Sequence, residues 1–126
     1  MRRKYYSAAV KWFSEAIYMN PSDARIRSNR SICWAKLTEP AFALYDAEAC
    51  VELRPESPEA HYREGVAWML LKNYAMASGA FIRATRLDPR NEKIGAAYRE
   101  AVDSLYHERL ARQPLETLNM IRKVFG

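Results

Sequence analysis

Residues 65–89 read GVAWMLLKNYAMASGAFIRATRLDP. Small residues and large aromatic residues recur along this stretch, and they are Gly65, Trp68, Tyr74, Ala77, Phe81 and Ala84. Small side chains let two helices approach to about 8–10 Å, and aromatic rings fill the spaces that remain. The stretch therefore predicts two closely packed antiparallel helices that end near Pro89.

The pattern recurs with a period of 34 residues. Pro21, Pro55 and Pro89 are separated by this interval. The same shift relates Ala9, Ala43 and Ala77; Met19, Leu53 and Leu87; Tyr6 and Tyr74; Phe13 and Phe81; Trp34 and Trp68; and Ala16 and Ala84. A fixed period of this length is typical of solenoids, in which each unit packs on its neighbours. We expect an all-α helix-turn-helix solenoid of about 2.5 repeats.

Capping signals divide the chain into helices. Ser22-Asp23 and Ser57-Pro58 each start the first helix of a unit, Pro40 starts a second helix, and Asn91 starts a further one. We expect a repeat domain over 1–111, comprising a half repeat at 5–21, repeats at 22–55 and 56–89, and a capping helix at 91–111. For 112–126 the sequence favours equally a short helix and a frayed tail.

These residues resemble the tetratricopeptide repeat (TPR) family, and the similarity runs from residue 6 to about residue 105. The segments SNRSICWAKL and ACVELRPESPEAHYREG more narrowly resemble the TPR blocks of plant ankyrin-TPR proteins and of co-chaperones. The resemblance implies a scaffold or adaptor that recognises another protein through the concave face of its first helices. The groove positions that it assigns are Arg25, Asn29, Lys36, Glu59, Tyr62, Arg63 and Val66, with Lys93 following on the next helix.

The resemblance also suggests an alternative, because many co-chaperone TPR domains clamp the C-terminal carboxylates of chaperones. Lys, Arg and Asn side chains form such a clamp through charge-assisted hydrogen bonds. Of the five clamp positions two precede this sequence, Asn29 and Arg63 match, and Glu59 replaces a lysine. Because Glu59 repels a carboxylate and can pair with Arg63, a general protein-binding groove is favoured over a clamp.

The register also places the start of the chain half-way through a unit. The sequence is then either a shortened chain or one whose first helix is replaced by another segment. We expect the face of Val10, Phe13 and Ile17 to be open, and Leu118, Ile121 and Phe125 to form an apolar stripe that covers it in a second copy. Self-association is therefore a further alternative function.

No cluster of residues predicts catalysis, a metal site or a cofactor. His61 lies at a position where the TPR family packs a side chain against the preceding repeat, so a core histidine is favoured over a general base. Cys33 and Cys50 have no zinc-type spacing with His61 and His107, so buried reduced thiols are expected. We therefore expect a non-enzymatic protein.

The charge is uneven along the chain. Residues 1–36 carry eight of the Lys and Arg side chains but only Glu15 and Asp23, which gives this third a net charge of +6 within a total of +5. An acidic partner is expected near Arg25–Lys36, and nucleic acid is a weaker alternative because the tryptophans occupy packing positions. No signal peptide or membrane-spanning run is visible, and we expect a cytoplasmic protein.

Overall fold

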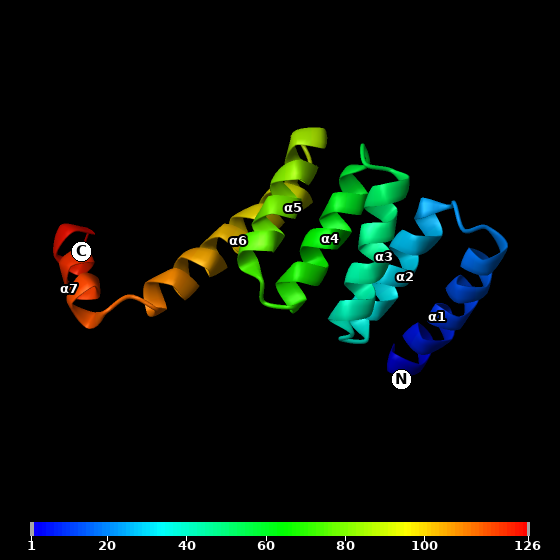
Figure 1. Cartoon of the computed structure of the whole chain (residues 1–126), viewed down its shortest axis with the longest axis horizontal. Coiled ribbons are helices and arrows are strands. Elements are labelled where there is room, and N and C mark those ends of the chain that lie inside the picture. Colours follow the sequence, from blue (N-terminus) through cyan, green and yellow to red (C-terminus); the bar gives the residue numbers. More distant parts are fainter. Residues whose placement is uncertain (1, 126) are drawn as a thin grey trace.

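The computed structural model describes residues 2–125, which form seven α-helices and no strand. The helices are α1 (Arg2–Met19), α2 (Ala24–Lys36), α3 (Pro40–Leu53), α4 (Pro58–Leu70), α5 (Tyr74–Leu87), α6 (Glu92–Ala111) and α7 (Leu115–Phe125). Helices α1 to α6 form a row of antiparallel neighbours, with α1 at one end and α7 beyond the other (Figure 1). The predicted all-α solenoid is confirmed.

Each repeat pairs a first helix with a second. Helices α2 and α3 form one repeat and α4 and α5 the next, while α3 also packs on α4, and α5 on α6. Helix α1 packs on α2, so it corresponds to a second helix. The first helices α2 and α4 also contact each other and lie along one face of the row.

The turn inside each repeat has the same backbone conformation. Thr38 and Lys72, which are 34 residues apart, both have a positive φ of about 60° (58° and 60°). In each turn an amide two residues beyond the helix donates to a carbonyl of its last turn: Glu39 to Trp34, and Asn73 to Trp68. The left-handed residue satisfies terminal carbonyls and reverses the chain. The repeat is therefore present in the backbone as well as in the side chains.

The core forms where helices approach at small residues. Ala77 and Phe81 of α5 and Ala101 of α6 form a buried cluster that packs on Tyr62 and Val66 of α4. A methyl group at Gly65 would collide with the ring of Phe81, so α4 and α5 reach their separation only because residue 65 has no side chain. The expected role of Gly65 in close helix packing is confirmed.

A buried ion cluster joins the first three helices. Asp46 of α3 is fully buried and accepts hydrogen bonds from Arg30 Nε and Nη2 at 2.7 Å and from Arg27 Nη1 at 3.2 Å. Arg30 Nη1 also donates to Ser14 Oγ of α1 at 3.0 Å. Hydrogen bonding to Asp46 raises the pKa of Arg30, so the guanidinium stays charged. The charges are tolerated inside because each carboxylate oxygen has a cationic partner.

The C-terminal part of the chain leaves the stack. Helix α6 packs on α5 through Ile94 and Ala101 and then continues beyond it, and α7 follows after Arg112–Pro114 (Figure 1). No residue of α7 is fully buried. Within residues 2–125 the search for a helix long and apolar enough to cross a membrane finds none.

The contact between Gly65 and Phe81 predicts a large effect of one methyl group. Gly65→Ala should lower the free energy of unfolding by about 1–3 kcal/mol because the ring or the helix must move. The matched control is Gly79→Ala, whose added methyl group would lie 3.6 Å from the flexible end of Arg83 and should be neutral or stabilising by up to about 1 kcal/mol. Urea unfolding followed by circular dichroism measures both, and equal effects would contradict the packing argument.

The buried cluster predicts that Asp46 is structurally essential. Asp46→Ala should cost about 3 kcal/mol, because Arg27 and Arg30 lose their acceptor while 16–18% of each side chain reaches solvent. Alanine fits sterically, since the equivalent position in α5 is the buried Ala80. Glu52→Ala, an exposed change on the same helix, should stay within about 0.5 kcal/mol. A loss for Asp46→Ala as small as that of the control would show that the ion cluster contributes no stability.

Candidate functional site: the face of α2 and α4

The starts of α2 and α4 are fixed by side-chain caps. Asp23 accepts from the backbone amide of Arg25 at 3.0 Å, and Ser57 accepts from that of Ala60 at 3.2 Å. Hydrogen bonding by the Arg25 side chain lowers the pKa of Asp23, so the cap is charged at neutral pH. These caps hold the two helix starts next to each other and set which side chains face the groove.

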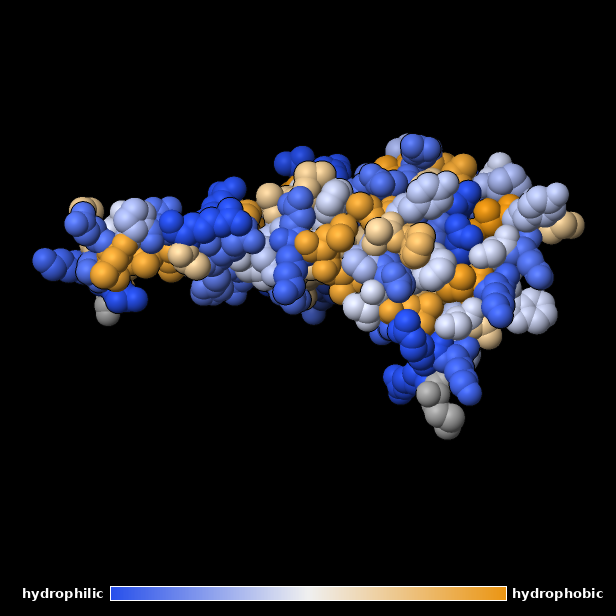
Figure 2. All heavy atoms as spheres, turned by 60° about the horizontal axis from the view of Figure 1, so that its bottom comes forward, coloured by the Kyte–Doolittle hydropathy of each residue, from blue (hydrophilic) through white to orange (hydrophobic). Residues whose placement is uncertain are grey.

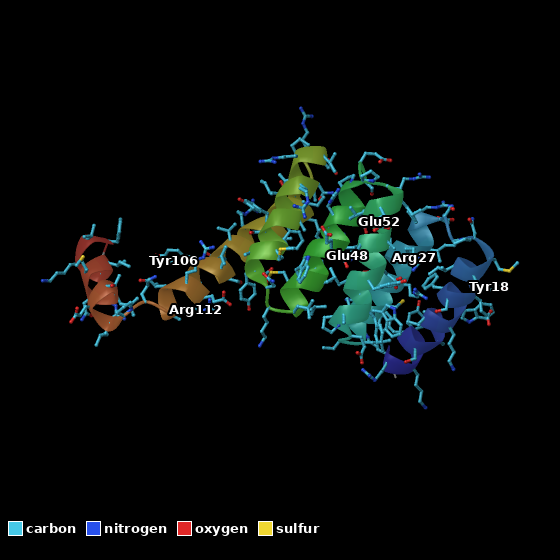
Figure 3. All side chains as sticks on the ribbon, in the orientation of Figure 1. Tyr18, Arg27, Glu48, Glu52, Tyr106 and Arg112 are labelled. Carbon is cyan, nitrogen blue, oxygen red and sulfur yellow. The ribbon has the colours of Figure 1, made fainter. Side chains whose placement is uncertain are left out.

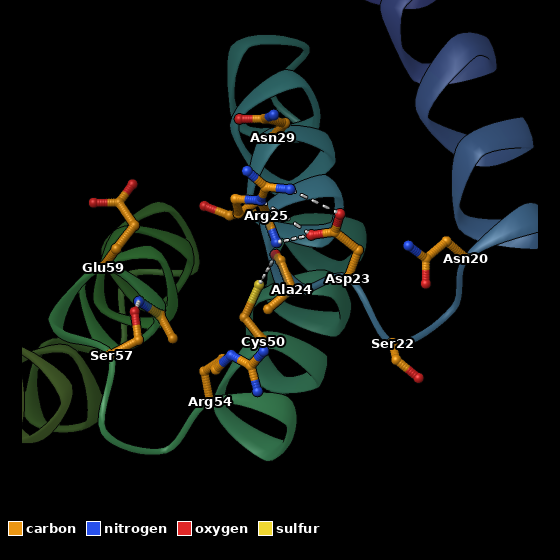
Figure 4. A pocket seen from close by; sticks show the side chains of 12 residues that line it. Asn20, Ser22, Asp23, Ala24, Arg25, Asn29, Cys50, Arg54, Ser57 and Glu59 are labelled. Carbon is orange, nitrogen blue, oxygen red and sulfur yellow. Dashed lines mark hydrogen bonds and ion pairs between the residues drawn. The ribbon is translucent and has the colours of Figure 1, made fainter.

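A pocket opens between the starts of the two helices. Its volume is about 800 Å³. It is lined by Asn20, Ser22, Asp23, Ala24, Arg25, Ser28, Asn29, Cys50, Arg54, Ser57, Glu59 and Ala60 (Figure 4). Three of the seven predicted partner-binding residues, Arg25, Asn29 and Glu59, therefore line one cavity. The others, Lys36, Tyr62, Arg63 and Val66, lie further along the same helices, outside the pocket.

The α2 side of the groove presents polar donors to solvent. The side chain of Arg25 is 89% exposed and pairs with Asp23 at 3.3 Å. Asn29 and Lys36 are exposed, and within residues 2–125 neither side chain forms a hydrogen bond or an ion pair. The sequence left open that Asn29 bonds the neighbouring helix, but its amide is available to a ligand.

The α4 side of the groove is paired internally. Arg63 donates through Nε and Nη2 to Glu59 Oε1 at 2.8 Å, so the predicted ion pair is confirmed. Tyr62 is half-buried against Phe81 with ring centroids 5.7 Å apart. The guanidinium of Arg63 lies 5.0 Å from the Tyr62 ring and the ammonium of Lys93 lies 4.6 Å from it. Glu59 therefore occupies the donor that a ligand carboxylate would need.

The structure corrects the expected open face of α1. Ile17 is only 7% exposed, and Val10 and Phe13 are half-buried, because this side of α1 faces α2. Among the α7 residues, Phe125 is exposed, and Leu118 and Ile121 are half-buried. The three predicted α1 residues therefore belong to the interior of the stack.

His61 and the two cysteines are buried. The His61 Nε2 atom lies 2.7 Å from the Pro55 carbonyl, which fixes the ring against the turn before α4, as expected for a packing histidine. Cys33 and Cys50 are free and buried. Burial raises the pKa of both thiols, and that of Cys50 rises to about 11. The Cys50 thiol lies 3.1 Å from the Ala24 carbonyl and donates to it.

Several residues of the pocket were absent from the sequence prediction. They are Asn20, Ser22, Arg54 and Ser57, which lie in the turns between units or at a helix end. A helical register assigns residues along first helices but gives no position for turn residues. The signal available was the recognised capping pair at each helix start, since a cap necessarily lies beside the mouth of the groove.

Comparison with known proteins identifies the repeat. The family model described as tetratricopeptide repeat matches residues 58–91. The first TPR domain of the human RPAP3 protein superimposes with a TM-score of 0.81 at 21% identity, covering 86% of this chain and 85% of that one. The fold is a tetratricopeptide repeat solenoid.

Relatives with the same repeats occur in plants and yeast. The TPR stack is 34% identical over 104 residues to an Hsp70-Hsp90 organizing protein of Triticum aestivum, covering 82% of this chain and 18% of that protein. The TPR2B domain of yeast Sti1, in a complex with pHsp70, shares 29% identity and a TM-score of 0.74 over 81% of this chain and 86% of that one.

The chain spans about a fifth of the length of the plant relatives, since the share is 18–19%. The resemblance to co-chaperone TPR domains is confirmed by these matches. The resemblance to plant ankyrin-TPR proteins stays a prediction.

The raised thiol pKa predicts low cysteine reactivity. Because Cys50 has a pKa of about 11, the native TPR stack should react with Ellman's reagent at pH 8 many times more slowly than the urea-unfolded chain. Stability should also fall as the pH rises from about 8.5 towards 11, since the unfolded thiol ionises first and the folded thiol stays protonated. Equal reaction rates for the native and unfolded chains would contradict the buried placement.

Proposed function

We propose that this TPR stack is a non-enzymatic, cytoplasmic adaptor whose concave face, formed by α2 and α4, binds an extended segment of a partner protein. The observation that carries the proposal is the row of exposed donors on α2. Asn29 and Lys36 have no partner within residues 2–125, and Arg25 projects beside them into solvent. Exposed donors on a rigid helix can bind a segment without first breaking internal contacts.

The two sides of the groove favour different ligand chemistry. The α2 side carries Arg25, Asn29 and Lys36 and suits acidic and carbonyl groups. On the α4 side, Tyr62 and Val66 are half-buried and offer an apolar strip next to the exposed carboxylate of Glu59. We therefore propose an extended segment whose acidic residues lie over α2 and whose apolar residues lie over α4.

A second candidate is a chaperone C-terminal tail. The observation that favours it is the complex of the yeast Sti1 TPR2B domain with pHsp70, together with the similarity to the Hsp70-Hsp90 organizing proteins. Asn29 and Arg63 match two of the five clamp positions. The ion pair between Glu59 and Arg63 opposes this function, because an incoming carboxylate must displace Glu59 and then lie near its charge.

The candidates are separated with one peptide in two forms. The probe is SGPTIEEVD, which is bound by the second TPR domain of human RPAP3, and its C-terminally amidated twin. Titration calorimetry of the whole chain should show weak binding that depends little on the terminal carboxylate and that Asn29→Ala and Lys36→Ala weaken. Glu59→Gln should tighten binding of the acid form by about tenfold, equivalent to ~1.4 kcal/mol, because Arg63 is released.

The matched control is Glu52→Gln, which removes an exposed acidic charge from α3 away from the pocket (Figure 3). It should leave both affinities unchanged. Strong binding by the wild-type chain that amidation abolishes would establish the chaperone-tail function instead. If neither peptide binds the wild-type chain or Glu59→Gln, the face of α2 and α4 is not a site for acidic segments.

A further inference from the structure

Helix α1 lacks a packing partner that every other second helix has. Helix α3 packs on α2 and α4, and α5 packs on α4 and α6, whereas α1 packs extensively only on α2. The side of α1 that corresponds to the first helix of its own unit is therefore uncovered within residues 2–125. The repeat register identifies the residues of this side.

The contacts of α3 and α5 show what the uncovered side does elsewhere. In α3 the residues that contact α2 are Ala43, Asp46 and Cys50, through hydrogen bonds with Ser31 at 2.8 Å, Arg30 at 2.7 Å and Ala24 at 3.1 Å. All three are fully buried, and so are their equivalents in α5, which are Ala77, Ala80 and Ala84. These positions are therefore the seat of a neighbouring helix in both complete repeats.

The equivalent residues of α1 are Ala9, Trp12 and Ala16. Trp12 is 74% exposed although both of its equivalents are buried, and Tyr5 and Met19 are exposed at the two ends of the same line. Residues 5, 9, 12, 16 and 19 follow a spacing of four and three, which gives one continuous apolar strip on a helix. We name these five residues the α1 strip.

The size of its side chains defines the occupant of the α1 strip. In α3 and α5 the seat is made mostly of alanines, which admit a helix at the closest separation. Trp12, Tyr5 and Met19 would hold a helix farther away, so large apolar side chains are needed to fill the space between. Lys4, Lys11 and Glu15 flank the strip on its solvent side, and none of its five residues is charged.

Helix α7 has the properties of such an occupant. Leu118, Ile121 and Phe125 recur at three and four residues and form a stripe that Val124 widens. The charged residues Glu116, Arg122 and Lys123 lie outside this stripe. Phe125 is 84% exposed and no residue of α7 is fully buried. Figure 2 shows hydrophobic atoms on this helix, which extends away from the stack.

One chain cannot join its own two surfaces. Helices α1 and α7 lie at opposite ends of the molecule, with α2 to α6 between them (Figure 1). The link Arg112–Pro114 has three residues and spans at most about 10 Å. We propose that α7 of one chain packs on the α1 strip of a second copy, so that each chain both gives a helix and receives one. This proposal is independent of the α2 and α4 groove.

Light scattering after size exclusion, run on the whole chain over a dilution series, tests the contact. The mass of the wild-type chain should rise from 14.6 kDa to at least twice that value as the concentration increases. Trp12→Glu removes the strip and Ile121→Glu removes the helix stripe, so each variant alone should stay at the single-chain mass. A mixture of the two should recover a species of twice that mass, because one intact strip meets one intact α7.

Matched controls separate this contact from a general effect of charge. Tyr18→Glu changes an exposed residue of α1 outside the strip (Figure 3), and Asn119→Glu changes the polar side of α7. Both should associate like the wild-type chain. A single-chain mass at every wild-type concentration would overturn the proposal. So would association that Trp12→Glu abolishes and Ile121→Glu leaves intact, since the occupant would then not be α7.

Discussion

The separation of neighbouring helices is the constraint on which this molecule depends. Second helices present alanines to their own first helices, and Gly65 leaves room for the ring of Phe81 where α4 meets α5. Because the same small positions return after 34 residues, each repeat takes the same orientation, and α2 and α4 come to lie next to each other. The groove is thus a consequence of core packing rather than a separate feature of the surface.

The ion cluster at Asp46 changes the charge of the groove. Asp46 takes the place that Ala80 has in the next repeat, and it holds Arg27 and Arg30 against the interior. Two of the basic side chains in the N-terminal third are therefore neutralised inside the protein. The sequence counted them towards the attraction for an acidic partner. The charge that a ligand meets on α2 comes from Arg25 and Lys36, which makes the groove less basic than the composition suggests.

Features that repeat could be predicted from the sequence, and features that occur once could not. The 34-residue period gave the all-α solenoid, the buried His61 and the close contact at Gly65, because each follows from a local register. The Asp46 cluster joins residues 16–19 positions apart, and only the packed structure brings them together. For the same reason the sequence assigned Val10, Phe13 and Ile17 to the open side of α1, although the contact with α2 turns them inward. Whether the predicted groove residues bind a partner remains a prediction.

The pair of Glu59 and Arg63 indicates where the specificity of the groove resides. A ligand carboxylate that binds Arg63 gains one charge-assisted contact, but the same event breaks the contact with Glu59 and places two carboxylates side by side. The exchange yields little net free energy, so an acid over α4 adds little to affinity. On α2 no such exchange is needed, since Asn29 and Lys36 have no internal acceptor. Discrimination between acidic segments should therefore depend on the residues that lie over α2, and α4 should contribute mainly apolar contact through Tyr62 and Val66.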